Sequence, residues 1–334
     1  MRFAALTAVA ALCVALAGSA APAAAPENVE ITNIGTDYWA GPLYVAQRNR
    51  LFEKHGLKAS VTNVKGGSLA LQTVLTKQAD VALLSYEHIL KAAVQGQRIV
   101  AVFRIVSRPV NNLVMKNAVA QGTEHMSLAD KVRKLKGLRI GLPSAGGSGE
   151  TILHVLGAKY GLRANADYTT VYLGSDPASY VTAFEHDQID AALPTEPAGV
   201  LVQSAGYGKT VINLMRGEVP ELNDLLYMCL AVNPETLKNR PDVVKAVTAT
   251  FQEALATLGH EPRAGADLMG QTFPALPGPA NQAAYAVSRS AWPGNGRMTV
   301  DQARRVLTYM TAQGGLNAPA NLDLAATFTN DFAP

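Results

Sequence analysis

The chain has 334 residues, a formal net charge of +3 and two cysteines. This charge is too small, and the basic residues are too dispersed, to indicate nucleic acid as a partner. Cys13 lies in an apolar N-terminal segment, so a mature chain would keep only Cys229 and could form no intrachain disulfide. The fold must therefore rest on its hydrophobic core, and the length allows two ordinary domains.

The N-terminus has the composition of a secretory signal peptide. Arg2 is the only charge before Glu27, residues 3–17 are almost wholly apolar, and small residues follow. We place the cleavage after Ala23, so that residues 1–23 form the signal peptide. Beyond it, no stretch of the sequence reaches the roughly 18 uninterrupted apolar residues of a membrane helix. These features predict an exported, periplasmic protein.

Strand and helix patterns alternate over residues 29–106. Apolar runs predict strands at 29–34, 59–64, 80–84 and 99–106, and residues with helical spacing lie between them. The first helix should begin near Pro42, because proline is favoured at helix starts. This alternation is typical of a doubly wound α/β unit. A strand at 112–115 and a polar loop at 116–127 then lead out of it.

A second α/β unit begins with a strand at 138–141. Helices are predicted at 148–160, 177–186 and 196–205, and strands at 169–172, 189–193 and 210–214. The apolar strand at 225–232 would carry the chain back to the first unit. Helices then follow at 241–258, 263–272, 280–289 and 299–313.

The two crossings between the units, near 110–115 and 225–232, predict a two-strand hinge. We therefore expect an α/β protein with two doubly wound lobes and a helical C-terminal region. Residues 24–113 would form the first part of lobe 1, and residues 114–224 would form lobe 2. Residues 225–334 would form the return to lobe 1 and the C-terminal helices.

Seven short segments, distributed through the two predicted lobes, match one family in order and spacing. They are Gly41–Ala46, Leu51–Leu57, Gly66–Ser68, Gln78–Ala82, Leu135–Gly141, Asp190–Ala192 and Glu196–Pro197. As a set they resemble the ABC-transporter solute-binding proteins of the nitrate, sulfonate and taurine group. This group also includes the binders of thiamine-pyrimidine precursors. The resemblance covers residues 29 to about 214, and the C-terminal third matches only in general layout.

The resemblance implies a type II periplasmic-binding-protein fold, in which two lobes close on a ligand by hinge motion. It also implies a membrane permease as partner, driven by a separate ATPase subunit. The Gly-rich turn at 146–149 lacks the Gly-Lys-Ser/Thr that completes a phosphate loop, so ATP would be hydrolysed elsewhere. We expect the protein to act as a monomer without a cofactor.

Polar and aromatic residues follow the predicted strands of lobe 1, at positions where α/β proteins bind small molecules. Asp37, Tyr38 and Trp39 come after the first strand. An aromatic ring there could stack on a planar ligand, or Trp39 could pack as core. Gly67 and Ser68 stand at the start of the next helix. Their backbone N–H groups would favour an anionic oxygen, and helix capping without a ligand is the alternative.

Three further candidates lie near the third strand and the first crossing. Ser85 follows the strand as a helix cap or as a ligand donor. Arg108 lies at the crossing, and Asn111 follows on the same segment. The planar guanidinium of Arg108 could bind two oxygens of a sulfonate or carboxylate, or it could form only a surface ion pair.

Lobe 2 supplies candidates for the facing side of a cleft. Ser144, Gly147 and Ser148 belong to a Gly-rich turn before a helix, which offers a second place for an anionic oxygen. Glu196 follows the strand that ends at Leu193. It could bond a ligand N–H or O–H group, or it could only brace the lobes. An unpaired Glu196 in the pocket would disfavour a purely anionic ligand.

The sequence shows no motif of the kind that enzymatic or metal chemistry requires. Relatives of the fold include a sulfinate desulfinase, which needs a Cys near the first strand, and a yeast-type pyrimidine synthase, which needs a Cys-rich motif and a lysine. Here the first strand region has no Cys, and Cys229 lies in an apolar run that indicates a buried, inert thiol. The six histidines show no metal-binding spacing. We expect no catalytic residue and no metal.

The sequence therefore favours the substrate-binding component of an ABC importer. Its expected ligand is a small organic anion, a sulfonate or carboxylate with or without an aromatic part. One alternative is a planar nitrogen heterocycle of the thiamine-precursor kind, stacked on Tyr38 and Trp39 and bonded by Asp37 or Glu196. Another is a ligand-sensing receptor that serves a membrane kinase.

Overall fold

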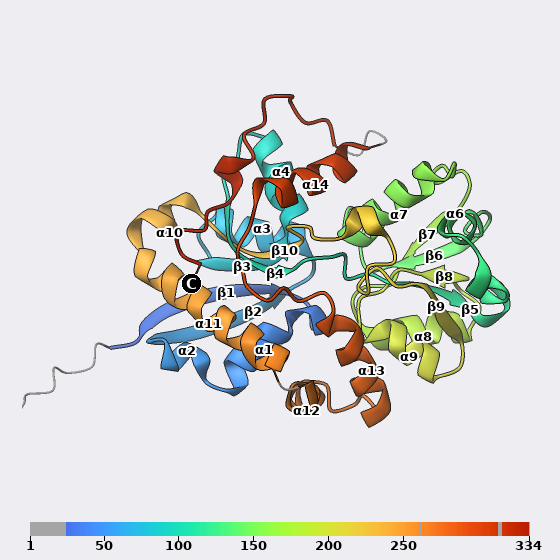
Figure 1. Ribbon diagram of the computed structural model, residues 1–334, viewed down its shortest axis with the longest axis horizontal. Helices are drawn as coiled ribbons and strands as arrows, with labels where there is room; N and C mark the ends of the chain where they lie inside the picture. The colour runs from blue at the N-terminus through green and yellow to red at the C-terminus, as the bar shows by residue number, and fades with distance from the viewer. Residues whose placement is uncertain (1–24, 261, 313–315, 334) are drawn as a thin grey trace, which may run out of the picture.

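The computed structural model describes residues 25–260, 262–312 and 316–333, which fold into two lobes joined by two crossing segments (Figure 1). The predicted signal peptide, residues 1–23, lies outside the described residues. Each lobe contains one five-stranded sheet with helices packed around it. Within the described ranges, no helix is both long enough and apolar enough to span a membrane.

The sheet of the first lobe has the strand order β2-β1-β3-β10-β4. Its strands are β1 (Glu27–Ile34), β2 (Leu57–Val64), β3 (Val81–Ser85), β4 (Val100–Val106) and β10 (Met228–Val232). β1, β2 and β3 are parallel, whereas β10 runs antiparallel to β3 and β4. β3, β4 and β10 are buried along their whole length, which explains their nearly continuous apolar sequences.

The sheet of the second lobe has the order β7-β6-β8-β5-β9. Its strands are β5 (Leu113–Lys116), β6 (Arg139–Leu142), β7 (Thr169–Tyr172), β8 (Ala191–Ala192) and β9 (Gly208–Ile212). β6 is parallel to β7 and β8, and β5 runs antiparallel to β8 and β9. Each sheet therefore contains one antiparallel strand, placed between two strands of its own lobe.

These inserted strands are the first strands that the chain forms after each crossing. Residues 107–112 lead from β4 into β5, and residues 213–227 lead from β9 into β10. The two crossings pair where they leave the first lobe: the backbone N–H of Leu225 donates to the carbonyl oxygen of Ser107 at 2.8 Å. The hinge is thus continuous with the interior of both sheets.

Helices surround both sheets and continue into a C-terminal helical region. In the first lobe they are α1 (Gly41–Arg48), α2 (Leu51–Lys54), α3 (Gly67–Leu75) and α4 (Tyr86–Val94). In the second they are α5 (Asn117–Ala120), α6 (Leu128–Arg133), α7 (Ser148–Lys159), α8 (Pro177–Glu185) and α9 (Ala198–Ser204). The C-terminal region contains α10 (Pro234–Asn239), α11 (Pro241–His260), α12 (Pro262–Thr272), α13 (Gly278–Arg289) and α14 (Val300–Thr311).

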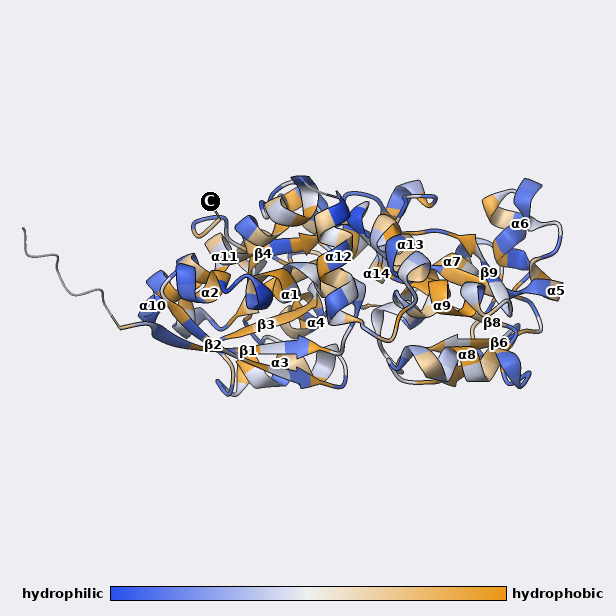
Figure 2. Ribbon diagram, turned by 90° about the horizontal axis from the view of Figure 1, so that it is seen from below, coloured by the Kyte–Doolittle hydropathy of each residue, from blue (hydrophilic) through white to orange (hydrophobic). Residues whose placement is uncertain are grey.

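The long helix α11 shows how the C-terminal region joins the core. Val243, Val247, Phe251 and Leu255 repeat at intervals of four residues and are buried, so one face of the helix packs inward. Its other face is mostly polar. Figure 2 shows helices of mixed hydropathy around more apolar strands. In this way α11 joins the core of the first lobe, whereas α13 and α14 also contact α9 and α7 of the second lobe.

The predicted elements agree with the structure except at a few short ones. The expected loop 116–127 contains α5 and a 3-10 turn at Thr123–His125. The short helix α10 was not predicted, although Asn233 caps it by accepting from the Glu235 backbone N–H at 2.9 Å. Pro234 then occupies its first turn. Elements this short depend on one cap rather than on periodic burial, so hydrophobic spacing does not detect them.

Candidate functional site

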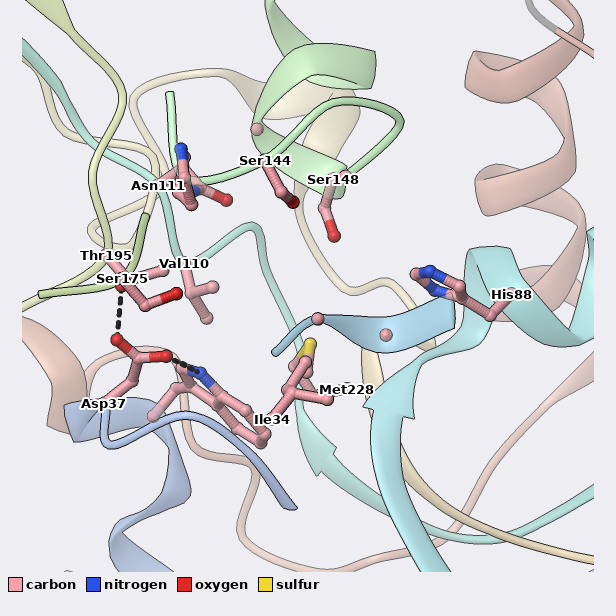
Figure 3. Close-up of a pocket in the computed structure, with 16 residues that line it drawn as sticks. Ile34, Asp37, His88, Val110, Asn111, Ser144, Ser148, Ser175, Thr195 and Met228 are labelled. Carbon is pink, nitrogen blue, oxygen red and sulfur yellow. Dashed lines mark hydrogen bonds between the residues drawn. The ribbon is translucent and has the colours of Figure 1, made fainter. Parts of the chain in front are cut away.

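A cavity lies between the lobes, where β1, β3 and β6 end and α3 and α7 begin (Figure 3). Its empty space measures about 590 Å³, including the mouth that opens to solvent. It is lined by Ile34, Asp37, Trp39, Gly66, Gly67, His88, Val110, Asn111, Pro143, Ser144, Gly147, Ser148, Gly149, Ser175, Thr195 and Met228.

The cavity brings together seven of the predicted site residues. They are Asp37, Trp39, Gly67, Asn111, Ser144, Gly147 and Ser148. They come from both lobes and from the first crossing, as a cleft between lobes requires. Their contact with a ligand stays a prediction. Tyr38, Ser68, Ser85, Arg108 and Glu196 are not among the lining residues.

Two helix N-termini reach the cavity from opposite lobes. α3 begins after Gly66 and α7 after Gly147, and neither glycine has a side chain with which to cap the helix. The first backbone N–H groups of a helix have no partner within it. Together with the helix dipole, they give each end a partial positive charge. The hydroxyls of Ser144 and Ser148 lie beside the α7 end and point toward the cavity (Figure 3).

His88 lies against the start of α3. Its Nδ1 is 2.8 Å from Ser85 Oγ, and burial lowers its pKa to about 4, so the ring is neutral at pH 7. A Cβ on Gly67 would lie only 2.4 Å from His88 Cε1, so only glycine fits at that position without movement of the ring. The predicted Ser85 therefore orients a lining residue instead of lining the cavity itself.

Asp37 lies on the other side of the cavity from His88 (Figure 3). Its carboxylate accepts hydrogen bonds from Trp39 Nε1 at 3.2 Å and from the Thr195 hydroxyl. Burial raises the pKa of Asp37 to about 6, and the two donors oppose that shift only in part. Asp37 and Thr195 belong to different lobes.

Two more hydrogen bonds join the lobes near the cavity. The Tyr38 backbone N–H donates to the Glu196 carbonyl oxygen at 2.9 Å. The ammonium of Lys91 donates to the Gly146 carbonyl oxygen at 3.2 Å. With the bond between Asp37 and Thr195, these contacts hold the lobes together on either side of the cavity.

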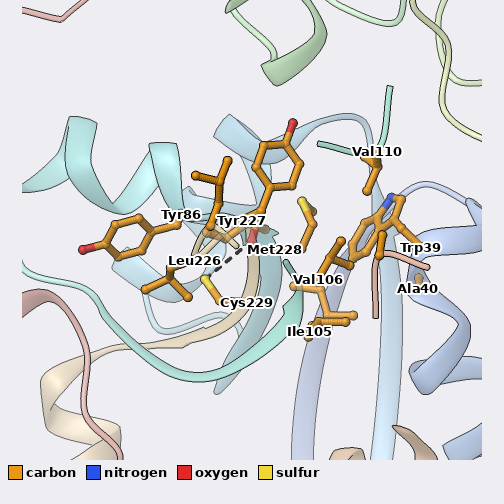
Figure 4. Close-up of a cluster of buried hydrophobic side chains, with 14 of the residues drawn as sticks. Trp39, Ala40, Tyr86, Ile105, Val106, Val110, Leu226, Tyr227, Met228 and Cys229 are labelled. Carbon is orange, nitrogen blue, oxygen red and sulfur yellow. Dashed lines mark hydrogen bonds between the residues drawn. The ribbon is translucent and has the colours of Figure 1, made fainter. Parts of the chain in front are cut away.

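The aromatic residues predicted to stack on a ligand serve mainly as core. Trp39 is 2% exposed and packs near Val110 and Val106 in a buried cluster (Figure 4), so only part of its ring reaches the cavity. Tyr38 is fully buried and stacks on Phe273, with ring centroids 4.5 Å apart. Trp39 therefore packs as core and also reaches the cavity, so its contact with a ligand stays a prediction.

Glu196 and Arg108 also have structural partners. Glu196 is buried and accepts from Asn112 Nδ2 at 2.9 Å and from the Val200 backbone N–H at 3.0 Å. Burial raises its pKa. The guanidinium of Arg108 donates to the carbonyl oxygens of Met215 and Ser290, which ties the first crossing to the second. Ser68 is exposed on α3, outside the cavity.

Three polar side chains of the cavity were missed by sequence reasoning: His88, Ser175 and Thr195. His88 is on α4, one turn after Ser85, Ser175 precedes α8, and Thr195 follows β8. The position of Thr195 after a strand was a usable signal, whereas nothing local distinguishes Ser175. The apolar side of the cavity is formed by Ile34, Val110 and Met228.

The structure agrees with the expectation of a buried thiol at position 229. Cys229 is fully buried on β10, its sulfur lies 3.6 Å from the Leu84 carbonyl oxygen (Figure 4), and burial raises its pKa. A thiol in this state is a poor nucleophile. In the part of the chain that the structure describes, no three His, Cys, Asp or Glu residues gather as metal ligands.

Comparison with solved structures identifies the fold. A protein from Bordetella bronchiseptica RB50 is 24% identical, with a TM-score of 0.78 over 91% of this chain and 95% of its own. The alkanesulfonate-binding protein SsuA from Xanthomonas axonopodis pv. citri, bound to MOPS, is 20% identical, with a TM-score of 0.70 over 92% and 99%. The periplasmic nitrate-binding protein NrtA from Synechocystis PCC 6803 is 14% identical, with a TM-score of 0.70 over 92% and 87%.

The predicted fold class is therefore confirmed: this is a two-lobed periplasmic-binding-protein fold, and the neighbours with a stated role are binding proteins rather than enzymes. No curated protein matches the sequence. The sequence pattern of the family described as NMT1/THI5 like matches residues 39–264, which is more than half of the chain and includes most of the cavity. The chain belongs to the NMT1/THI5-like family.

Proposed function

We propose that this protein is the periplasmic solute-binding component of an ABC importer and that its lobes close, as a monomer, on a small organic anion. The observation that carries the proposal is the pair of uncapped helix N-termini, α3 and α7, that meet at one cavity from opposite lobes. An anion between them would accept backbone N–H bonds from both lobes at once. Ligand binding would therefore stabilise the closed arrangement.

The other lining residues support an acid group of modest size. Ser144 and Ser148 add hydroxyl donors beside the α7 end, and none of the described lining residues is Lys or Arg. Neutral donors of this kind suit a sulfonate or carboxylate, whose charge is spread over several oxygens. Ile34, Val110 and Met228 would contact an alkyl chain or a small ring attached to that acid.

A thermal-shift screen of the mature chain tests the ligand class. Each acid is paired with an uncharged analogue of similar shape: methanesulfonate with dimethyl sulfone, benzenesulfonate with methyl phenyl sulfone, and benzoate with benzamide. A ligand at 100 times its dissociation constant adds about 2.7 kcal/mol of stability. We expect stabilisation by at least one acid and none by its analogue. Equal stabilisation by both members of every pair would contradict the proposal.

The transport role needs a separate experiment in the source organism. Deletion of the gene should abolish ATP-dependent uptake of the acid identified in the screen, and the complete gene should restore it. Genes for a permease and an ATPase beside this gene would agree with that result. Normal uptake in the deletion strain, combined with loss of a transcriptional response to the acid, would instead identify a receptor for a membrane kinase.

A further inference from the structure

The cavity has two chemically different sides. On one side lie the α3 and α7 N-termini, the two serine hydroxyls and the neutral ring of His88, all suited to an acid group. On the other side lies the carboxylate of Asp37 with the Thr195 hydroxyl (Figure 3). A simple anion would satisfy the first side and would leave the second with a negative charge close to its own.

The carboxylate of Asp37 is buried without a cationic partner. Asp37 is 5% exposed, and its two hydrogen-bond donors, Trp39 Nε1 and the Thr195 hydroxyl, are both neutral. Among the described residues that line the cavity there is no Lys or Arg to balance it. Buried charges in proteins are normally paired, because an isolated carboxylate loses its hydration without compensation.

A carboxylate has about four lone-pair positions, and two of those on Asp37 are used. It can therefore accept further hydrogen bonds from a ligand in the cavity. The raised pKa of Asp37, about 6, is the expected sign of a carboxylate that lacks a cation. At pH 7 and above the group is still mostly ionised, so a ligand cation would meet a full negative charge.

We propose that the ligand is a small zwitterion, whose protonated nitrogen binds Asp37 while its acid group binds the α3 and α7 N-termini. This inference rests on the proposed function, because it assigns the acid group to the same helix ends. Asp37 is then a specificity-determining residue: it selects acids that carry an amino group over acids that lack one. Thr195 holds the carboxylate in place from the facing lobe.

The experiment compares acids that differ only in the amine. Isothermal titration at pH 7.5 measures 3-aminopropanesulfonate against propane-1-sulfonate, and 4-aminobutanoate against butanoate. In the wild-type protein the amine-bearing member of at least one pair should bind about tenfold tighter or more, as expected for a charge-assisted hydrogen bond. In Asp37→Asn that preference should disappear.

Thr195→Val is the matched control, because it removes the hydrogen bond between the lobes but keeps the carboxylate. It should bind both members of a pair more weakly and keep the preference for the amine. Equal or tighter binding of the amine-free acids by the wild-type protein would overturn the inference and leave the proposed function standing. Failure of every acid to bind would overturn both. A preference for the amine that persists in Asp37→Asn would overturn the role of Asp37, because another residue would then bind the amine.

Discussion

The ionisation of Asp37 should make the stability of the ligand-free protein depend on pH in a predictable direction. The pKa of Asp37 is about 6 in the folded chain, against an ordinary value of 3.8, because burial disfavours the charged form. Over this interval the folded state holds the proton more tightly than the unfolded state. The contribution of Asp37 to stability is therefore largest below pH 3.8 and is lost as the pH rises through 6.

The magnitude follows from the two pKa values. One pKa unit corresponds to about 1.4 kcal/mol, so the whole shift is worth about 3 kcal/mol above pH 7. Between pH 5 and pH 8 the calculated loss is about 1.4 kcal/mol. In Asp37→Asn this titration is absent. The unfolding free energy of wild type minus that of the variant should therefore fall by about 1.4 kcal/mol over the same range.

Urea denaturation of the two mature proteins at pH 5, 6, 7 and 8 measures this difference. Glu87 and Glu196 are also buried with raised pKa values, but both are present in each protein and cancel in the comparison. The nearby tyrosines, Tyr44 and Tyr180, have pKa values raised above the range of the experiment. The absolute difference includes the altered hydrogen bonds of the new amide, so only its change with pH is decisive.

A wild-type minus variant difference that stays constant from pH 5 to pH 8 would refute the reasoning. It would mean that water reaches the carboxylate in the ligand-free protein and that its pKa is ordinary. A difference that rises with pH would mean that the pKa of Asp37 is lowered in the folded chain, so that its hydrogen-bond donors or a nearby cation outweigh the effect of burial.

Four other substitutions test the surroundings of the cavity. Gly67→Ala should weaken ligand binding about tenfold in titration calorimetry, since its Cβ would clash with the ring of His88. Gly147→Ala should lose less, because its Cβ would lie 2.7 Å from the Ser144 hydroxyl, which can rotate away, and 3.3 Å from the Ser144 carbonyl oxygen. Glu87→Gln should cost under about 1.5 kcal/mol in urea denaturation, because burial raises the pKa of Glu87 and the amide keeps the size of the side chain without its charge. A larger loss would mean that the carboxyl group, with its hydrogen bond from the Tyr309 hydroxyl, stabilises the fold more than an uncharged group of the same size. Arg108→Ala should lower the unfolding free energy by about 1–3 kcal/mol, because the side chain donates to the backbone carbonyls of Met215 and Ser290. The ligand dissociation constant should stay nearly unchanged. A large loss of affinity with little loss of stability would instead place the Arg108 side chain at the ligand.

The sequence could predict the strands and the helix starts because these depend on local patterns. The buried strands have long apolar runs, and Gly67 and Gly147 mark helix N-termini directly after strand ends. The sequence could not show which of the two aromatic residues, Tyr38 or Trp39, reaches the cavity. The first ring stacks on Phe273, more than two hundred residues away in the chain, and the second keeps an edge at the cavity.

Local patterns in the sequence also could not show the contacts of Arg108 and His88. Arg108 has the chemistry of an anion-binding residue, and only the folded hinge shows that its donors are directed to the carbonyls of Met215 and Ser290. His88 carried no motif, and its place at the cavity depends on its packing against Gly67. In both cases the side chain's direction is set by tertiary contacts, which a single sequence does not contain.

The position of β10 inside the first sheet determines the order in which the lobes can be completed. All strands of the second lobe lie within residues 113–212, so that sheet can pair fully as soon as they are available. The first sheet must wait for Met228–Val232, which separates β3 from β4. Until then, two of its most apolar strands keep unpaired edges, a state prone to aggregation. The lobe that begins first in the chain is the last to be finished, and the chain is most prone to aggregation in that interval.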